Sequence, residues 1–276
     1  MDASAEQDPT FRIITTLKNI LFNTEDIQQS RPLISQWHEI SKTLLVRHQR
    51  RLRAAAQAYN WTNVCEQLDK PDCMQTLENV IEDATSRHPQ PENGMIMDIR
   101  IRILIDRDGS IQAESVPMGE AKSLRTLETD SSHQPPSNGP PPSLSANGRC
   151  SIICLDTVST VPALHTLHKT TYRAPYDAAR ERAGITKCPP GEREVLLFNP
   201  EWEVMEASLC AVYFYRHGKW VVPPSESGGM VSATKLWAID SGFCTERPIK
   251  LDEVEDGENV WLSNALRGFF LGKISI

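Results

Sequence analysis

Residues 95–105 (MIMDIRIRILI) constrain the fold of this chain more than any other segment, because their apolar and charged side chains alternate. A period of two residues is typical of a β-strand with one buried face. Asp108 and Gly109 then provide a turn, and residues 110–116 return as a partner strand. The pattern predicts an antiparallel hairpin whose apolar face carries four isoleucines: Ile99, Ile101, Ile103 and Ile105.

Two helices and a further strand accompany this hairpin. The alanine-rich segment 47–59 (RHQRRLRAAAQAY) predicts a helix, and residues 73–84 predict a second one. The β-branched run at 11–17 indicates a strand. We therefore expect residues 1–116 to form a small N-terminal α/β domain. The apolar face of the first helix would carry Leu45, Leu52, Ala55, Ala56 and Tyr59.

The composition changes between residues 117 and 148, where proline, serine and glycine dominate (SSHQPPSNGPPPSLSANG). Such a segment predicts a flexible linker or a surface loop insertion. A proline-rich ligand for a partner domain is the less favoured alternative.

Residues 149–276 predict a second, larger and more β-rich domain, so the chain as a whole is expected to have a mixed α/β (α+β) fold. Strands are expected at 150–156, 195–198, 203–208, 210–215, 220–222 and 260–262. A helix is expected over 169–184, with Gly184 as its stop, and another over 232–240, capped by Gly242.

Bulk composition excludes several function classes. The net charge of −7 argues against a nucleic-acid-binding protein, and no apolar run approaches the length of a membrane span. The polar, acidic N-terminus does not resemble a signal peptide, so we expect a cytoplasmic protein. The seven cysteines are irregularly spaced without a CxxC pair, which favours free thiols over a metal site or disulfides.

Three groups at fixed intervals suggest a chemistry. Lys169 can form a Schiff base, Glu206 can pair with a pyridine nitrogen, and the Gly228-Gly229 turn before a helix can cradle a phosphate. Together they indicate a site for pyridoxal phosphate. Each also has a plain alternative, since a lone lysine usually faces solvent, a strand glutamate often points outward, and many loops contain paired glycines.

Two other patterns each have more than one interpretation. The basic run from Arg47 to Arg53 is either a solvated helix face or a source of one inward arginine for a phosphate. Ser208 and Cys210 could act as nucleophiles, but no histidine stands near them in sequence and no GxSxG elbow occurs. Hydrolase chemistry is therefore disfavoured.

Several segments together resemble the class IV aminotransferase family (fold type IV pyridoxal-phosphate enzymes), and within it 4-amino-4-deoxychorismate lyases and their fungal-type relatives. Along the chain, in family order, the segments are RHQRRL, LHKTTYRAPYDAAR, LLFNPEWEVMEASLCAVYF, PPSESGGMVSATK and WLSNALRGF. The resemblance implies that Lys169 is the Schiff-base lysine and Glu206 the partner of the pyridine nitrogen. It also implies that Arg51 binds the phosphate, with His48 as its helix partner.

The same resemblance assigns further residues. It implies that Ala233 and Thr234 bind the phosphate through backbone N–H groups and the threonine hydroxyl. It places four residues in or beside the substrate pocket: Tyr172, Arg173, Ser263 and Asn264. It further implies a small N-terminal domain, a larger C-terminal domain with the cofactor between them, an amino-acid-like small-molecule substrate and a homodimer.

The reaction that the resemblance implies is elimination from amino-deoxychorismate, which releases 4-aminobenzoate and pyruvate. Two alternatives stay open: an aminotransferase of the branched-chain or D-amino-acid type, and a degenerate member that acts as a binding protein.

Five positions depart from the family pattern. Ala211 stands for a usual asparagine, Val222 for a threonine, Ser232 for a glycine, and Lys235 and Lys18 each for an arginine. The Cβ of Ser232 is expected to strain the phosphate turn. The departures put the substrate in doubt more than the cofactor.

Overall fold

The computed structural model describes residues 8–23, 31–129, 132, 134–142 and 150–276. The chain divides into two compact units. The N-terminal unit comprises residues 2–134 together with the short segment 169–171, and the C-terminal unit comprises 135–168 and 172–276. Within the described residues, no helix is long and apolar enough to cross a bilayer.

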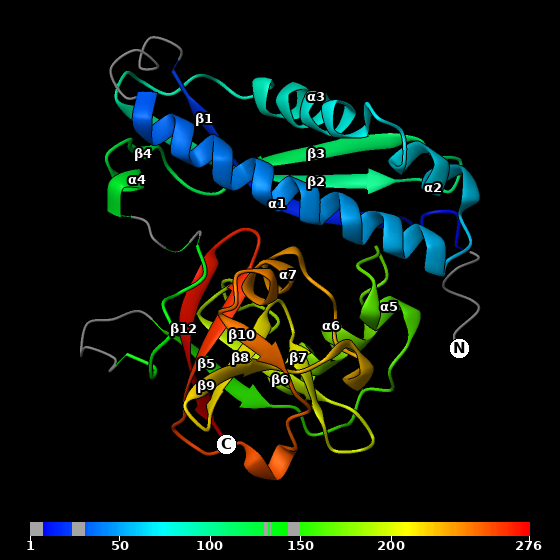
Figure 1. The fold of residues 1–276 in the computed structure, drawn as a ribbon, viewed down its shortest axis with the longest axis vertical. Coiled ribbons are helices and arrows are strands. Elements are labelled where there is room, and N and C mark those ends of the chain that lie inside the picture. Colours follow the sequence, from blue (N-terminus) through cyan, green and yellow to red (C-terminus); the bar gives the residue numbers. More distant parts are fainter. Residues whose placement is uncertain (1–7, 24–30, 130–131, 133, 143–149) are drawn as a thin grey trace. The chain divides into compact units, whose positions relative to one another are not determined.

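The N-terminal unit is an antiparallel sheet with helices packed against it (Figure 1). The sheet order is β1-β2-β3, and the short β4 also pairs with β2. Its strands are β1 (Ile13–Phe22), β2 (Met95–Ile105), β3 (Ile111–Pro117) and β4 (Lys122–Ser123). Its helices are α1 (Arg31–Ala58), α2 (Thr62–Leu68), α3 (Cys73–Ser86) and α4 (Thr126–Thr129).

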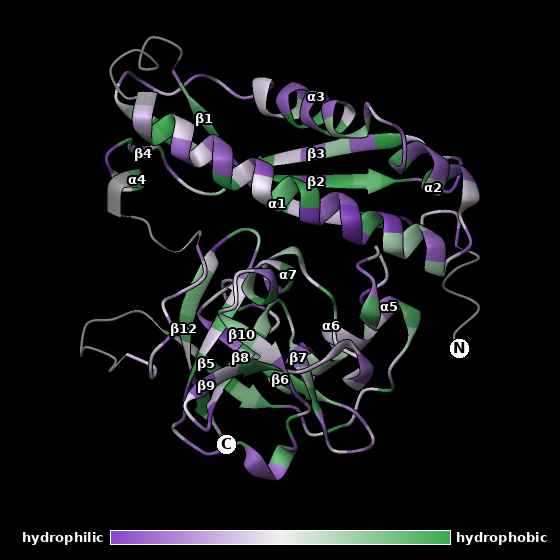
Figure 2. Ribbon diagram, in the orientation of Figure 1, coloured by the Kyte–Doolittle hydropathy of each residue, from purple (hydrophilic) through white to green (hydrophobic). Residues whose placement is uncertain are grey.

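The alternation that predicted the hairpin is confirmed. β2 pairs with β3 around the Asp108-Gly109 turn, and Gly109 has a positive φ of 94°. All four predicted isoleucines of β2 are fully buried, and Figure 2 shows hydrophobic residues concentrated along this strand. The predicted helix 47–59 forms the second half of the longer α1, whose Leu52, Ala55 and Ala56 are buried as expected.

The segment expected to be a linker begins with ordered elements, β4 and α4. Leu124 lies between them and is buried in a cluster with Ile20, Ile34, Trp37 and Ile96. One apolar anchor thus attaches the start of the segment to the N-terminal unit. Residues 130, 131, 133 and 143–148 of the predicted linker lie outside the described residues.

The C-terminal unit is built on an eight-stranded sheet of order β10-β9-β8-β11-β12-β5-β6-β7. The strands are β5 (Ser151–Leu155), β6 (Arg193–Phe198), β7 (Val204–Ala207), β8 (Ala211–Arg216), β9 (Lys219–Val222), β10 (Cys244–Glu246), β11 (Asn259–Asn264) and β12 (Gly268–Ser275). The helices are α5 (Leu164–Leu167), α6 (Ala174–Arg182) and α7 (Ala233–Asp240), with 3₁₀ turns η4 (Ser225–Ser227) and η5 (Leu251–Glu253).

One expectation about local structure is wrong. Residues 169–173 are not helical, and α6 begins only at Ala174. Pro175 lies in the first turn of α6, where a missing N–H costs nothing, whereas deeper inside a longer helix it would remove a hydrogen bond. The residues before the helix extend instead, and Thr170 forms a β-bridge with Ile13.

Candidate active site

Lys169 is fixed on the first strand of the N-terminal unit. The backbone N–H of Ile14 donates to the carbonyl of Lys169 at 3.0 Å. Two residues later, the Thr171 hydroxyl accepts a hydrogen bond of 3.0 Å from the backbone N–H of Arg12. The three-residue segment 169–171 therefore pairs with β1, and its conformation is set by backbone contacts rather than by a helix.

Arg51 is held by Ile14 of β1, the same residue that bonds Lys169. Its Nη2 donates to the Ile14 carbonyl at 2.7 Å, and the side chain is buried on α1. Ile14 thus bonds Lys169 through its N–H and Arg51 through its carbonyl. Two residues 118 positions apart in sequence, which the sequence analysis assigned to one cofactor, share one anchor in the N-terminal unit.

His48 lies one helical turn before Arg51 and is buried. Its Nδ1 is 2.7 Å from the Thr15 hydroxyl, while Nε2 has no hydrogen-bond partner within the described part of the chain. Burial, with the positive charges of Arg51 and Lys169, lowers the pKa of His48 to about 3. The imidazole ring is therefore neutral, and the positive charges of Arg51 and Lys169 act on it. This environment is suited to an anion.

Glu206 occupies β7 of the C-terminal unit, opposite Leu197 of β6, and is buried. Its Oε1 accepts two hydrogen bonds, from the Tyr176 hydroxyl at 2.6 Å and from the backbone N–H of Met230 at 3.0 Å. Sequence analysis did not single out Tyr176, although it lies only seven residues after Lys169. The alternative of an outward-facing strand carboxylate is excluded.

The loop that precedes α7 packs closely on β7. Gly228 has a positive φ of 100°, and a Cβ on Gly229 would overlap the backbone carbonyl oxygen of Met205. Both glycines are therefore required for the approach that brings the Met230 N–H onto Glu206. The expected strain at Ser232 is absent, since its φ is −82° and its hydroxyl caps α7 by accepting from the Lys235 N–H.

A chain of hydroxyl groups runs from the partly buried Ser232 at the start of α7 to buried residues. The Thr234 hydroxyl lies 3.2 Å from that of Ser232 and accepts a hydrogen bond of 2.9 Å from Ser263. The Ser263 hydroxyl is 2.8 Å from the Tyr213 hydroxyl. Ala233 and Thr234 are both buried. The structure thus brings together the predicted residues Thr234 and Ser263, which come from α7 and β11.

Two of the remaining predicted pocket residues, Asn264 and Arg173, contact the turn that follows β7. Asn264 donates to the Leu209 carbonyl at 3.4 Å and lies 3.2 Å from the sulfur of Cys210. Arg173 donates to the Ser208 carbonyl at 3.2 Å. Tyr172 makes an edge contact with the ring of His165.

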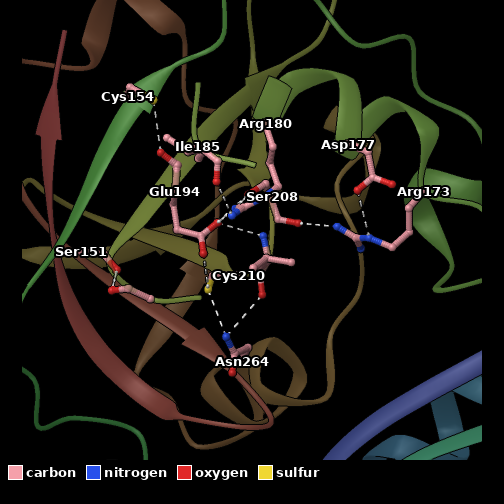
Figure 3. A network of polar contacts seen from close by, with 12 residues as sticks. Ser151, Cys154, Arg173, Asp177, Arg180, Ile185, Glu194, Ser208, Cys210 and Asn264 are labelled. Carbon is pink, nitrogen blue, oxygen red and sulfur yellow. Dashed lines mark hydrogen bonds and ion pairs between the residues drawn. The ribbon is translucent and has the colours of Figure 1, made fainter. Parts of the chain in front are cut away.

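A buried ionic network fixes the same turn from its other side (Figure 3). The Oε2 atom of Glu194 on β6 accepts from the Ser208 hydroxyl at 2.6 Å and from the Leu209 N–H at 3.1 Å. Arg180 of α6 donates to the Ser208 hydroxyl at 2.9 Å and lies 3.7 Å from Glu194. Burial is the main cause that raises the pKa of Glu194. The sequence analysis missed both charged residues.

Three family departures are explained by packing. Ala211 and Val222 are buried in one apolar cluster that also contains Tyr213 and Trp220. The buried Lys235 ammonium donates to the Pro223 carbonyl at 2.7 Å and pairs with Glu246 at 2.9 Å. The seven cysteines are all free thiols, and among the described residues no group of histidines, cysteines and carboxylates could hold a metal ion.

A family model described as "Amino-transferase class IV" matches residues 36–271 of this chain. The chain belongs to the class IV aminotransferase family. This confirms the resemblance inferred from the sequence segments, and the observed mixed α+β architecture confirms the expected fold type IV. The chain is accordingly an enzyme of a family of pyridoxal-phosphate-dependent lyases and transaminases.

Similar proteins carry names of both kinds. A Schizosaccharomyces pombe protein described as "Putative aminodeoxychorismate lyase" is 25% identical over 241 residues, 84% of either chain. The structure of a "Putative amino-acid aminotransferase" from Mesorhizobium loti has a TM-score of 0.62 at 19% identity and covers 96% of this chain and 99% of its own. "A hypothetical aminotransferase from Mycobacterium tuberculosis, PLP-bound form" has a TM-score of 0.52 at 14% identity, with coverage of 98% and 83%.

The residues of this class IV aminotransferase fit the family cofactor within each unit. In the N-terminal unit, Lys169 and Arg51 supply positive charge, and the buried, neutral His48 has an Nε2 without a hydrogen-bond partner among the described residues, a set suited to a phosphate-bearing aldehyde. In the C-terminal unit, a buried carboxylate at Glu206 is held beside a glycine loop that leads into α7. These are the donor and acceptor types that pyridoxal phosphate requires.

Proposed function

We propose that this class IV aminotransferase binds pyridoxal phosphate and acts as a lyase on 4-amino-4-deoxychorismate, releasing 4-aminobenzoate and pyruvate. The observation that carries the proposal is the anchoring of Lys169 and Arg51 on the two backbone groups of Ile14. An amine and a buried guanidinium held in this way suit an aldehyde and a phosphate. The similarity to the Schizosaccharomyces pombe protein favours the lyase reaction.

Each cofactor-binding residue has a distinct part in the proposal. Arg51 would bind the phosphate, whose charge is also favoured by the first N–H groups of α7 at Ala233 and Thr234. Glu206 would face the pyridine nitrogen, and Lys169 would hold the aldehyde carbon. Four residues would orient the substrate: Tyr172, Arg173, Ser263 and Asn264.

When bound, pyridoxal phosphate supplies an electron sink for the negative charge that develops at the substrate α-carbon. The Nζ of Lys169 would take the α-proton as a general base. The Glu206 carboxylate would favour a protonated pyridine nitrogen. The elimination would produce an aromatic ring, which makes the release of 4-aminobenzoate favourable.

An aminotransferase reaction is the second candidate, favoured by the similarity to the Mesorhizobium loti structure. It would use the same lysine, glutamate and arginine, and would differ in where Lys169 returns the proton. The two reactions are separated by whether turnover requires a keto-acid acceptor. Product that forms only when an acceptor is present would exclude the lyase.

The cofactor proposal is tested by the absorbance spectrum of the purified protein with pyridoxal phosphate, before and after borohydride, followed by peptide mapping. We expect a visible band that borohydride removes and a reduced adduct on the peptide that contains Lys169. The Lys169→Ala variant should lose the band, and Lys187→Ala, which removes an exposed lysine, should keep it. Wild-type protein that stays colourless would instead indicate a non-catalytic binding protein.

We also propose a cytoplasmic homodimer, as the family resemblance implies. Sedimentation of the purified chain and fractionation of cells that express it would test these two statements.

A further inference from the structure

The Tyr213 hydroxyl is a polar group inside an apolar cluster of the C-terminal unit. The tyrosine is fully buried, and its ring packs against those of Phe243 and Phe269 at centre-to-centre distances of 5.6 and 5.8 Å. Within the described part of the chain, its one hydrogen-bond partner is the Ser263 hydroxyl, at 2.8 Å. Burial raises the pKa of Tyr213 well above its ordinary value, so the phenol keeps its proton. Because a buried donor needs an acceptor, the tyrosine proton goes to Ser263.

This direction fixes the protons of the next two hydroxyl groups. A hydroxyl carries one proton, and Ser263 uses its own to donate to Thr234 at 2.9 Å. The Ser263 oxygen is then left to accept from Tyr213. The Thr234 oxygen is an acceptor toward Ser263, so the Thr234 proton must point elsewhere. Ser263 and Thr234 are both buried, so solvent does not readily take over either role.

The Thr234 proton is left for an acceptor at the start of α7. The neighbouring hydroxyl is that of Ser232, at 3.2 Å, whose oxygen already accepts from the Lys235 N–H at 3.1 Å. Ser232 caps the helix and is only partly buried, so this end of the hydroxyl chain is the one nearest solvent. A charged phosphate oxygen is a stronger acceptor than a serine hydroxyl and would take the Thr234 proton in preference.

We propose that Ser263 is a positioning residue, which holds the Thr234 side chain as a hydrogen-bond donor for the phosphate of pyridoxal phosphate. The inference rests on the proposed function, in which Thr234 binds that phosphate. A threonine can place its hydroxyl in more than one χ1 rotamer, and the bond from Ser263 selects one of them. Ser263 therefore acts through Thr234, and this role requires no contact between the serine and the cofactor.

Comparison of two ligands tests this role. Pyridoxal phosphate and pyridoxal differ only in the phosphate group, so the ratio of their dissociation constants separates the phosphate contacts from a general loss of structure. Thr234→Val should reduce the preference for pyridoxal phosphate about tenfold, because it removes a hydrogen bond to a charged group. Ser263→Ala should reduce it at least about threefold, because the threonine hydroxyl remains but is no longer held in one rotamer.

A double variant separates an indirect role from a direct one. Because Ser263 acts through Thr234, Ser263→Ala should cause no further loss of preference when Thr234 is already valine. Tyr213→Phe combined with Ser263→Ala replaces two buried hydroxyl partners by apolar groups, so it should fold even if Ser263→Ala alone does not, with the same reduced preference. The control, Ser241→Ala, removes a hydroxyl at the other end of α7 and should leave the preference unchanged. An unchanged preference in Ser263→Ala, or losses that multiply in the double variant, would overturn the proposal.

Inorganic phosphate distinguishes this proposal from the proposed function. We expect calorimetry to show weaker binding of inorganic phosphate to cofactor-free Ser263→Ala than to wild type. If that loss is seen but borohydride traps no pyridoxal phosphate on Lys169, the positioning role stands and the proposed function fails. If the adduct forms but Ser263→Ala keeps the full preference for pyridoxal phosphate, the proposed function stands and the positioning role fails. Wild-type protein that binds neither pyridoxal phosphate nor inorganic phosphate would refute both.

Discussion

The Ser208 hydroxyl lies 2.6 Å from Oε2 of Glu194, and both side chains are buried. Arg180 donates to the same hydroxyl at 2.9 Å, so the serine stands between a buried cation and a buried anion (Figure 3). Ser208 follows Glu206 by two residues. The network therefore fixes the end of the strand that carries the carboxylate assigned to the cofactor.

Replacement of Ser208 by alanine should destabilise the protein through this network. The variant removes the hydroxyl that bridges Arg180 and Glu194, and it leaves the carboxylate with one fewer donor in a buried site. We expect a loss of about 2 kcal/mol in the free energy of unfolding, measured by urea denaturation. Ser225→Ala removes an exposed hydroxyl bonded to Glu226 and should change stability by less than about 0.5 kcal/mol.

Glu194→Gln should change how stability depends on pH. Burial raises the pKa of Glu194 above its ordinary value of 4.5, so the folded state holds the proton more tightly than the unfolded state. Stability contributed by this group is then highest in acid and falls as the pH rises from 4.5 through the folded pKa.

Urea denaturation at a series of pH values should therefore show wild type losing stability relative to Glu194→Gln as the pH rises. A difference that instead grew in favour of wild type would mean that attraction to Arg180 outweighs the burial of the carboxylate.

Local patterns in the sequence were sufficient for much of the fold. Alternation defined β2, because a half-buried strand imposes a period of two, and helical periodicity located the buried face of α1. β12 was not predicted, because Gly268 and Gly272 interrupt its apolar pattern. The predicted helix over 169–184 was wrong at its start, where pairing with β1 overrides helix propensity.

Fewer residues of the candidate site could be predicted from the sequence. Lys169, Arg51 and Glu206 were found because family motifs surround them. Tyr176 and Glu194 were missed because their partners lie 30 and 14 residues away and are brought close only by tertiary structure. A tyrosine within an ordinary helical segment carries no local signal that its hydroxyl will meet a carboxylate.

Gly229→Ala tests the packing of the loop on β7. A Cβ at this position would overlap the carbonyl oxygen of Met205, so the loop must move away and lengthen the bond between the Met230 N–H and Glu206. We expect a loss of about 2 kcal/mol in stability, from overpacking, and weaker binding of pyridoxal phosphate. Gly139→Ala adds the same methyl group in open space without a positive φ, and should be neutral in both measurements.

His48→Asn tests the neutral imidazole beside Lys169 and Arg51. The pKa of His48 is about 3 in the folded protein against an ordinary 6.5, so between these values only the unfolded state takes up the proton. Stability should therefore fall as the pH drops below 6.5, by about 1.4 kcal/mol per pH unit from this residue. Asparagine keeps a polar atom near the position of Nδ1 for Thr15 but cannot titrate.

Urea denaturation between about pH 5 and pH 7 should show this slope in wild type and its loss in His48→Asn. His88→Asn removes a half-buried imidazole of the same unit that bonds Ser115, and because it retains His48 it should keep most of the slope. If wild type and His48→Asn lost stability in parallel as the pH fell, His48 would be charged in the folded protein. The three positive charges of Lys169, Arg51 and His48 would then be stable together only with an anion already bound. They would not form an anion site in the ligand-free protein.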